Sequence, residues 1–340
     1  MIREAIAKLA YGESLAEGEA AESMEEIMTG TATPAQIGAF ATALRLKGET
    51  VEEIVGLARV MRAKATPVRT RRPVIDTCGT GGDASGTFNI STAAAFVAAG
   101  AGLAVAKHGN RAMTSHCGSA DVLEALGVAI DLGPAAVGRC LDQVGIGFMY
   151  APVYHPAMKH AAGPRREIGI RTVFNVLGPL TNPAGAQAQV LGVPAADLVE
   201  KLATALLRLG CRHALVVHGE DGVDELSISG PTRVAEVREG QVRTYSLAPE
   251  DCGLRRAERG ELRGGSAGEN AELLRGILAG RVDGGARRVV VLNAAAALVA
   301  GDVAASLREG VALAAEAIDD GRALAKLDGL VQFGRSLAAG

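Results

Sequence analysis

The chain has 340 residues, enough for about two domains of ordinary size. Hydrophobic residues make up 48% of it and charged residues 21%, which indicates a globular protein with a large core. A net charge of −3 and an aromatic content of 3% argue against a protein that binds nucleic acid through a basic surface or by stacking on bases.

Residues 1 to about 66 are expected to form helices only. Thr33 opens a capping box with Pro34 at the first helical position, and Gly48 is a natural stop for that helix. Thr50 repeats the capping box and begins a further helix. The pattern predicts a small helical domain of four short helices.

After residue 73, short apolar runs alternate with helical segments, as is typical of a parallel sheet covered by helices. The expected strands are VIDTC (74–78), LAVAKHG (103–109), VAIDLG (128–133), GIGFMY (145–150), ALVVHG (214–219) and RVVVLN (288–293). TRVAEV and QVRTYSL (232–247) are expected to add an antiparallel hairpin, and residues 302–340 to return to helix. The fold class is therefore α/β, with a mainly parallel central sheet.

The cysteines are scattered and show no spacing typical of a zinc site or a disulfide framework. Their odd number, 5, favours a reducing compartment. The N-terminal segment is acidic from Glu4 onward and has no long apolar run, so we expect no signal peptide. The stretch from Ser91 to Ala106 is shorter than the about 20 apolar residues that cross a bilayer. We expect a cytoplasmic protein.

The loop at 76–92, DTCGTGGDASGTFNIST, joins a predicted strand to a helix and is rich in glycines, hydroxyls and carboxylates. Exposed backbone N–H groups in such a loop can surround an anion, which suggests a phosphorylated ligand that arrives with a metal. A GxGxxA dinucleotide fingerprint also begins at Gly79, but the helix should open only near Asn89 and the next strand ends in Lys107 instead of an acid. No P-loop motif occurs.

A second loop, Lys107 to Arg111, leaves the next expected strand. If the two strands are neighbours, both loops face one cleft at the carboxyl ends of the strands. Lys107 and Arg111 would supply positive charge there, and Gly109 would allow a close backbone approach. Asn89 and Ser91 would lie at the start of the helix that follows the first loop.

Two adjacent acids, Asp224 and Glu225, follow the strand ALVVHG. With Glu220 and Asp221 nearby, the run could be a solvated turn. The alternative, which we favour, is a Mg²⁺ site, because Mg²⁺ usually takes one or two carboxylates together with phosphate oxygens and water.

The segment from Tyr150 to Ala184 carries further polar residues. His155 and His160 are poor metal partners at their spacing, and we expect both to be surface residues. An arginine here would suit a carboxylate. The residues alone leave open whether this is Arg165 or Arg166.

Four segments, in order and spacing, resemble the anthranilate phosphoribosyltransferase family: 76–92, KHGNR (107–111), GPLTNP (178–183) and DELS (224–227). The resemblance covers nearly the whole chain. It implies a type III phosphoribosyltransferase of the nucleoside phosphorylase-like fold, usually a homodimer through its helical domains. A helical domain of residues 1–70, joined by a helical segment from about 165–188, would be hinged to an α/β domain of residues 71–340.

The implied reaction transfers the phosphoribosyl group of 5-phosphoribosyl 1-pyrophosphate (PRPP) to the amine of anthranilate, in tryptophan biosynthesis. The resemblance implies that Ser91, Asp224 and Glu225 hold two Mg²⁺ ions and that Gly79, Asn110 and Arg165 contact anthranilate. It implies a larger set around PRPP: Gly79, Gly82, Asp83, Thr87, Asn89, Ile90, Ser91, Thr92, Lys107, His108, Gly109, Asn110, Arg111, Ala112, Met113, Thr114, Ser115 and Ser119. No general acid or base is assigned.

Two other functions fit the same fold. A pyrimidine nucleoside phosphorylase would use phosphate as the nucleophile. A non-catalytic relative that binds nucleic acid should be basic and should have lost part of the glycine loop or of the Asp224–Glu225 pair. This chain is slightly acidic and keeps both features.

Overall fold

The computed structural model describes residues 1–112 and 117–338. Its N-terminal part consists of four helices, as expected: α1 (Ile2–Ala10), α2 (Glu17–Met28), α3 (Pro34–Lys47) and α4 (Val51–Lys64). The hydroxyls of Thr33 and Thr50 cap α3 and α4 by accepting backbone N–H groups, and Gly48 ends α3 with a φ of 87°. The capping signals in the sequence therefore set these helix ends.

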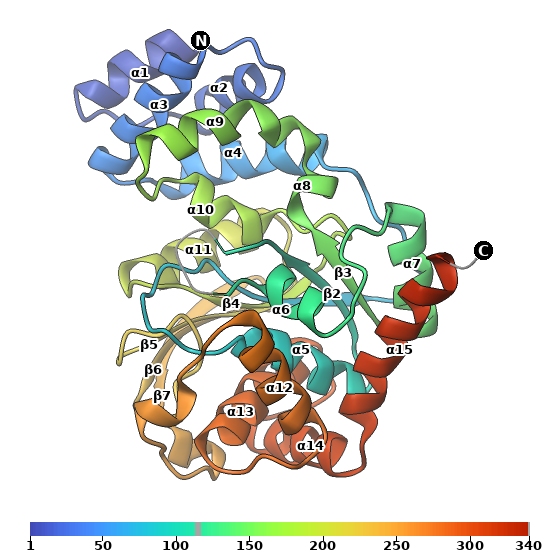
Figure 1. Cartoon of the computed structure of the whole chain (residues 1–340). Coiled ribbons are helices and arrows are strands. Elements are labelled where there is room, and N and C mark those ends of the chain that lie inside the picture. Colours follow the sequence, from blue (N-terminus) through green and yellow to red (C-terminus); the bar gives the residue numbers. More distant parts are fainter. Residues whose placement is uncertain (113–116, 339–340) are drawn as a thin grey trace.

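A helix from the middle of the chain joins this bundle. Helix α9 (Lys159–Ile168) packs beside α3, where Ile168 approaches Gly38 (Figure 1). The ring of His160 lies against Gly30, between α2 and α3. We call α1–α4 together with α9 the helical part. The chain passes between it and the rest of the molecule three times: after α4, before α9 and after α9.

The rest of the chain is built on one seven-stranded sheet, in the order β3-β2-β1-β4-β5-β6-β7. The strands are β1 (Val74–Gly79), β2 (Ala104–Gly109), β3 (Ile146–Tyr150), β4 (Ala188–Gly192), β5 (His213–Gly219), β6 (Thr232–Arg238) and β7 (Gln241–Leu247). Strands β1 to β5 pair in parallel, and β6 and β7 form the expected antiparallel hairpin. The α/β class and the mainly parallel sheet are confirmed.

Two expected strands are wrong. Residues 128–133 form no strand, and residues 288–293 lie inside helix α13 (Gly285–Ala300). Helix α13 is buried over almost its whole length, so VVVL carries no polar face that would mark a helix. Strand β4 was not expected from the sequence, although it is the central strand of the sheet, between β1 and β5.

Helices cover both faces of the sheet (Figure 1). The core on one face includes α5 (Ile90–Gly100), α6 (Ser119–Ala125), α12 (Ala267–Leu278), α13, α14 (Leu307–Asp319) and α15 (Arg322–Ala338). On the other face, α7 (Pro134–Gln143) covers β2 and β3, and α11 (Asp197–Arg208) covers β5 and β6. Two short helices, α8 (Ala151–Tyr154) and α10 (Phe174–Leu177), flank α9 in the chain.

The helical part is attached to the rest of the molecule by packing, by the half-buried Arg62 and by ion pairs of Arg208 in α11 with Glu17 and Glu52. Its apolar core continues through α11 to the sheet. Arg62 of α4 donates from Nε to the Leu180 carbonyl at 2.6 Å and from Nη1 to the Leu209 carbonyl at 2.7 Å. None of the helices in the described ranges has both the length and the apolar character needed to cross a membrane.

Candidate functional site

The loops that carry the predicted motifs leave the same edge of the sheet. Strands β1, β2 and β5 are parallel to one another, because β1 pairs in parallel with β2 and with β4, and β4 pairs in parallel with β5. They end at Gly79, Gly109 and Gly219. The loops after these strands therefore gather at the carboxyl edge, where open α/β sheets bind their ligands. Strands β1 and β2 are neighbours, so the condition under which the two loops were expected to face one cleft is met.

The glycine loop and the acidic turn contact each other directly. The Gly81 N–H donates to Asp224 Oδ2 at 2.8 Å, and the Ser91 N–H donates to Glu225 Oε1 at 3.0 Å. A Cβ at Gly79 would lie 2.3 Å from Asp224 Oδ2, so only glycine fits there beside the carboxylate. Residues that are far apart in the sequence thus form one site.

The acids of this site repel each other. Burial raises the pKa of Asp224 well above its ordinary value, and the nearby charges of Asp83 and Glu225 raise it further. Burial also raises the pKa of Glu225 to about 7, although Lys107 and the Ser91 N–H oppose the shift. A cation bound between these carboxylates would relieve the repulsion.

The available ligands fit Mg²⁺ best in company with a phosphate. The carboxylates of Asp224, Glu225 and Asp83 and the hydroxyl of Ser91 are hard oxygen donors. Within the described residues, no group of three or more His, Cys, Asp or Glu side chains is arranged to hold a metal alone. Phosphate oxygens and water would complete the coordination, as is usual for Mg²⁺.

Arg171 is a charged residue of the site that the sequence analysis missed. Its Nη2 donates to the Thr80 carbonyl at 3.1 Å, and its guanidinium occupies the space beside Gly82, where a Cβ would lie 1.8 Å from Nη1. Burial lowers the pKa of Arg171, while Asp224 and Asp83 raise it. The position of Arg171 three residues after the end of α9 gave no signal in the sequence.

Lys107 lies beneath the glycine loop. It is buried, and its Nζ donates to the Thr77 carbonyl at 2.6 Å. Next to it, Asp76 accepts bonds from the His108 N–H at 3.2 Å and from Asn182 Nδ2 at 2.7 Å. Burial raises the pKa of Asp76 to about 6. The GPLTNP segment thus contacts the buried Asp76, next to Lys107, through Asn182.

Two histidines pack against each other next to Asp76 and Lys107. The ring centroids of His108 and His155 are 5.0 Å apart, and His108 Nδ1 lies 3.2 Å from the Gly178 carbonyl, to which it can only donate. Burial lowers the pKa of His108 to about 3 and that of His155 to about 4. Both rings are therefore neutral at pH 7. The expected surface position of His155 is wrong, since its exposed fraction is 2%.

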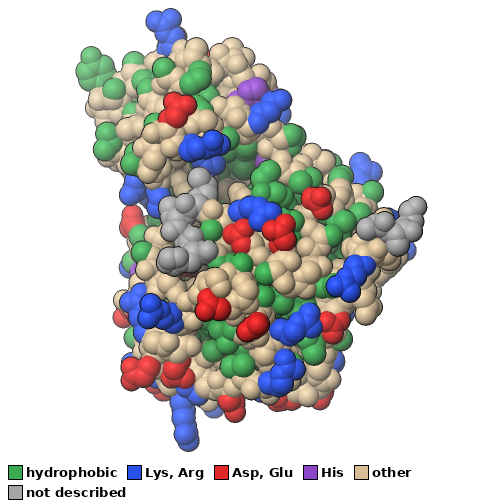
Figure 2. All heavy atoms as spheres, in the orientation of Figure 1, with side chains coloured by type: hydrophobic (Ala, Val, Ile, Leu, Met, Phe, Trp, Pro, Cys, Tyr) green, Lys and Arg blue, Asp and Glu red, His purple; other side chains and the backbone are tan. Residues whose placement is uncertain are grey.

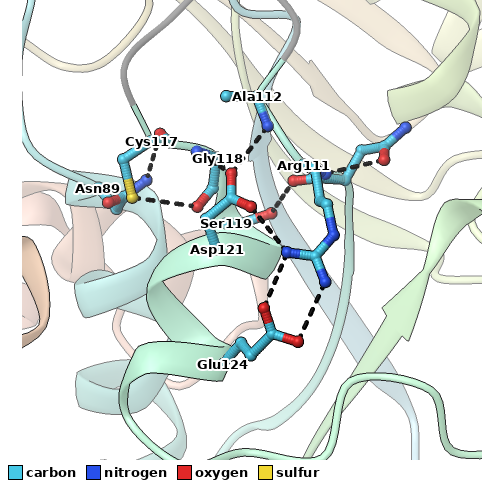
Figure 3. A network of polar contacts seen from close by, with 9 residues as sticks. Asn89, Arg111, Ala112, Cys117, Gly118, Ser119, Asp121 and Glu124 are labelled. Atoms are coloured by element: carbon cyan, nitrogen blue, oxygen red, sulfur yellow. Dashed lines mark hydrogen bonds and ion pairs between the residues drawn. The ribbon is translucent and has the colours of Figure 1, made fainter. Parts of the chain in front are cut away.

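The second loop is closed by an acid of α6 (Figure 3). Asp121 Oδ2 accepts the N–H groups of Ala112 and Gly118, each at 2.9 Å. Arg111 forms ion pairs with Asp121 at 3.0 Å and with Glu124 at 2.8 Å. The arginine predicted to contact PRPP is therefore held by acids of α6 in this structure.

The remaining predicted residues are distributed over both loops. Asn110 is exposed, and its carbonyl accepts a bond from the Ser119 hydroxyl at 3.3 Å. Ile90 and Thr92 are buried in α5, and Thr87 pairs with Arg263 in an isolated bridge. Met113, Thr114 and Ser115 lie outside the described residues.

The two candidate arginines of α9 differ in environment. The Arg165 guanidinium lies 5.4 Å from the centre of the Phe174 ring, and burial lowers its pKa. Arg166 is exposed. Among the described residues, no hydrogen bond joins Arg165 to Gly79 or Asn110.

Figure 2 shows acidic and basic side chains interspersed over the described residues of one face, without a broad basic field. This distribution agrees with the small net charge of −3. It does not favour a surface for a long polyanion.

Comparison with known proteins places the motifs in a family. Residues 3–65 match the model "Glycosyl transferase family, helical bundle domain", and residues 71–324 match "Glycosyl transferase family, a/b domain". The anthranilate phosphoribosyltransferase of Chloroflexus aurantiacus is 62% identical over 335 residues, which cover 98% of this chain and 99% of the relative.

Solved structures agree. The anthranilate phosphoribosyltransferase of Thermus thermophilus superimposes with a TM-score of 0.92 at 49% identity, covering 97% of this chain and 99% of that one. The enzyme of Saccharomyces cerevisiae, solved in complex with PRPP and Mg, gives a TM-score of 0.90 at 28% identity, with 98% of each chain covered.

Proposed function

This chain belongs to the anthranilate phosphoribosyltransferase family, and we propose that the carboxyl edge of its sheet carries out the family's reaction. The anthranilate nitrogen forms a bond to C1 of PRPP, the bond from C1 to the pyrophosphate oxygen breaks, and the amine loses a proton. The observation that carries this proposal is the joining of the glycine loop to Asp224 and Glu225 through the N–H groups of Gly81 and Ser91.

We propose that PRPP binds over the glycine loop and the start of α5. Gly81 and Gly82 have positive φ values of 65° and 81°, a backbone conformation that glycine adopts without strain. Asn89 and Ser91 lie where α5 begins, and the N-terminus of a helix favours an anion. Arg171 supplies positive charge beside Gly82.

Mg²⁺ would be held by Ser91, Asp224 and Glu225, and we propose two ions, as the family resemblance implies. The oxygen donors and the raised pKa values of the two acids support this assignment. When bound, Mg²⁺ neutralises charge on pyrophosphate. The yeast relative was solved with PRPP and Mg.

The chain's own contribution to the reaction is positioning and charge stabilisation. The amine of anthranilate is neutral at pH 7, so it needs no strong base to attack. His108 is neutral with its pKa at about 3, so it is no source of an acidic proton for the leaving group. Loop N–H groups and Arg171 would stabilise the pyrophosphate as it leaves, which is electrostatic catalysis. Contact with the helical part would align anthranilate and exclude water.

Gly79, Asn110 and Arg165 are proposed for anthranilate. Arg165 is favoured over Arg166 because it is half-buried over Phe174, whereas Arg166 faces solvent. A guanidinium binds a carboxylate with two parallel hydrogen bonds.

A cytoplasmic homodimer through the helical parts is also proposed. Tyr11 and Leu46 of the helical part are 87% and 82% exposed, and large apolar side chains with such exposure suit a contact between copies. Analytical ultracentrifugation of the wild type and of a variant with Tyr11→Glu and Leu46→Glu tests this. A monomeric wild type would reject it.

The reaction itself is tested by mixing the protein with anthranilate, PRPP and Mg²⁺ and following the fluorescence of anthranilate. We expect a loss of fluorescence that requires PRPP and is prevented by a chelator. Phosphorolysis of pyrimidine nucleosides is measured in parallel. Phosphorolysis without any loss of anthranilate would overturn the proposal.

A further inference from the structure

A buried asparagine outside the predicted motifs contacts the glycine loop from α12. Asn270 is 3% exposed. Its Nδ2 donates to Asn89 Oδ1 at 3.1 Å, and Asn89 Nδ2 donates to the Cys117 carbonyl at 3.1 Å. Figure 3 shows the second of these bonds, from the start of α5 to Cys117, just before α6. Asn270, Asn89 and Cys117 thus link three separate segments.

Backbone groups fix the direction of both amides. Asn270 Oδ1 accepts the Gly265 N–H at 2.8 Å, and an N–H can only donate. The Asn270 NH₂ group must then point to Asn89, whose own oxygen has to accept. At the other end, the Cys117 carbonyl can only accept, which turns the Asn89 NH₂ group toward it. The two side chains therefore have one consistent orientation.

The segment just before α12 is joined to the glycine loop by backbone hydrogen bonds. The Phe88 N–H donates to the Leu262 carbonyl at 3.1 Å, and the Gly264 N–H donates to the Gly86 carbonyl at 2.8 Å. A Cβ at Gly264 would lie 2.8 Å from both the Phe88 nitrogen and the Thr87 oxygen, so the close approach needs glycine. The segment before α12 is thus a fixed platform from which Asn270 reaches Asn89.

We propose that Asn270 is a positioning residue that sets the orientation of Asn89 for PRPP and couples the glycine loop to Cys117, just before α6. The inference rests on the proposed function, because it assigns Asn89 to PRPP. Asn89 is half-buried, and its amide retains one N–H and one lone pair beyond the chain of bonds. With the amide fixed by Asn270, these groups are presented to the ligand in one arrangement. Without Asn270, only the bond to the Cys117 carbonyl holds the amide, and its oxygen has lost its donor.

The test compares PRPP binding in the presence of Mg²⁺ and steady-state kinetics for the wild type, Asn270→Asp, Asn270→Ala, Asn89→Ala and the double variant Asn89→Ala/Asn270→Ala. In Asn270→Asp the carboxylate still accepts the Gly265 N–H but offers no donor to Asn89. We expect the KM for PRPP and its Kd each to rise about tenfold in both Asn270 variants, with the KM for anthranilate changed less than about twofold. The double variant should bind PRPP no more weakly than Asn89→Ala alone.

Ser266→Ala is the matched control, because Ser266 caps α12 through the Glu269 N–H but takes no part in the chain of amides. It should lower the melting temperature as a lost cap does, without a change in the KM for PRPP. Effects of Asn89→Ala and Asn270→Ala that add in the double variant would overturn the inference. So would Asn270 variants that lower only the melting temperature.

A wild type that consumes no anthranilate would reject the proposed function. In that case NMR of the Asn89 side-chain NH₂ group still tests whether Asn270 sets the orientation of the Asn89 amide. Its two proton signals should shift in Asn270→Asp and stay in place in Ser266→Ala. Unchanged signals in Asn270→Asp would overturn the inference.

Discussion

The N–H of Gly81 donates a hydrogen bond of 2.8 Å to the carboxylate of Asp224, although 143 positions separate them in the chain. This bond crosses from the loop after β1 to the turn after β5, and β4 lies between these strands. The loop that would bind phosphate and the turn that would bind metal are therefore placed by the same sheet edge.

Asp224→Asn and Glu225→Gln should weaken the response to Mg²⁺. Each substitution removes a charged oxygen ligand but keeps the size of the side chain, and a loss of about 10- to 100-fold in apparent Mg²⁺ affinity is expected. A Mg²⁺ titration of turnover measures it. Glu220→Gln, at an exposed acid of the same turn, is the control. An unaltered titration in both site variants would rule out the metal role.

Arg165→Ala should raise the KM for anthranilate on the order of tenfold, because a charge-assisted pair with the carboxylate is lost. The KM for PRPP should change far less. Arg166→Ala is the matched control, since this arginine is the next residue of α9 and is exposed. If both substrates or both variants were affected equally, the assignment of Arg165 would be wrong.

Gly79→Ala should reduce turnover at least about tenfold and cost about 1 to 3 kcal/mol of stability, since its Cβ would meet Asp224 Oδ2 at 2.3 Å. Gly268→Ala is the control: its Cβ would meet no atom within 4 Å, and it lies in α12, where alanine is the better helix former. Kinetics and urea unfolding distinguish the two. Normal turnover in Gly79→Ala would contradict the close contact.

The buried Asp76 should make stability depend on pH. Burial raises its pKa from 3.8 to about 6, so the folded state binds this proton more tightly than the unfolded chain does. The Asp76 contribution to the free energy of unfolding is therefore full below about pH 4 and is lost as the pH rises through about 6.

Asp76→Asn should remove this contribution. Between pH 4 and pH 7 the free energy of unfolding of the variant should therefore fall by about 1 to 3 kcal/mol less than that of the wild type. Urea unfolding at several pH values measures the difference. Asp131→Asn, at an exposed aspartate, controls for the substitution itself. Parallel pH profiles for wild type and Asp76→Asn would show that Asp76 does not titrate in this range.

Arg62→Lys should lower the free energy of unfolding by about 1 to 3 kcal/mol, because an ammonium group cannot reach both the Leu180 and Leu209 carbonyls as the guanidinium does. Arg59→Lys on the same helix affects only an exposed pair with Glu17, for which less than about 1 kcal/mol is expected. Equal losses in denaturant unfolding would show that the Arg62 bonds do not stabilise the attachment of the helical part.

Features that depend on neighbouring residues in the sequence could be predicted. The capping residues Thr33 and Thr50 mark helix starts because their partners lie three residues away, and the late start of α5 follows from where the glycines end. Features decided by packing could not. The run RVVVLN resembles a strand because burial of α13 on all sides removes the helical period. The burial of His155 has no signal in the sequence, because nothing nearby shows that His108 covers it.

Site residues that belong to a sequence motif could be predicted. Single residues that reach the site from a distant part of the chain could not. Asp224 and Glu225 stand out as adjacent acids after a strand. Arg171 and Asn270 have no such pattern, since each reaches the glycine loop through one or two tertiary contacts. Arg111 was expected to face the ligand, but the acids Asp121 and Glu124 lie close enough to hold it.

Helix α9 comes from the middle of the chain, yet it completes a bundle whose other helices lie at the N-terminus. The matched helical bundle model ends at residue 65, so it lacks this helix. A gene fragment for residues 1–65 would encode an unfinished bundle with an uncovered apolar face on α3. The helical part therefore could not be exchanged between proteins by replacing one contiguous segment of the chain, because α9 lies far from α1–α4 in the sequence.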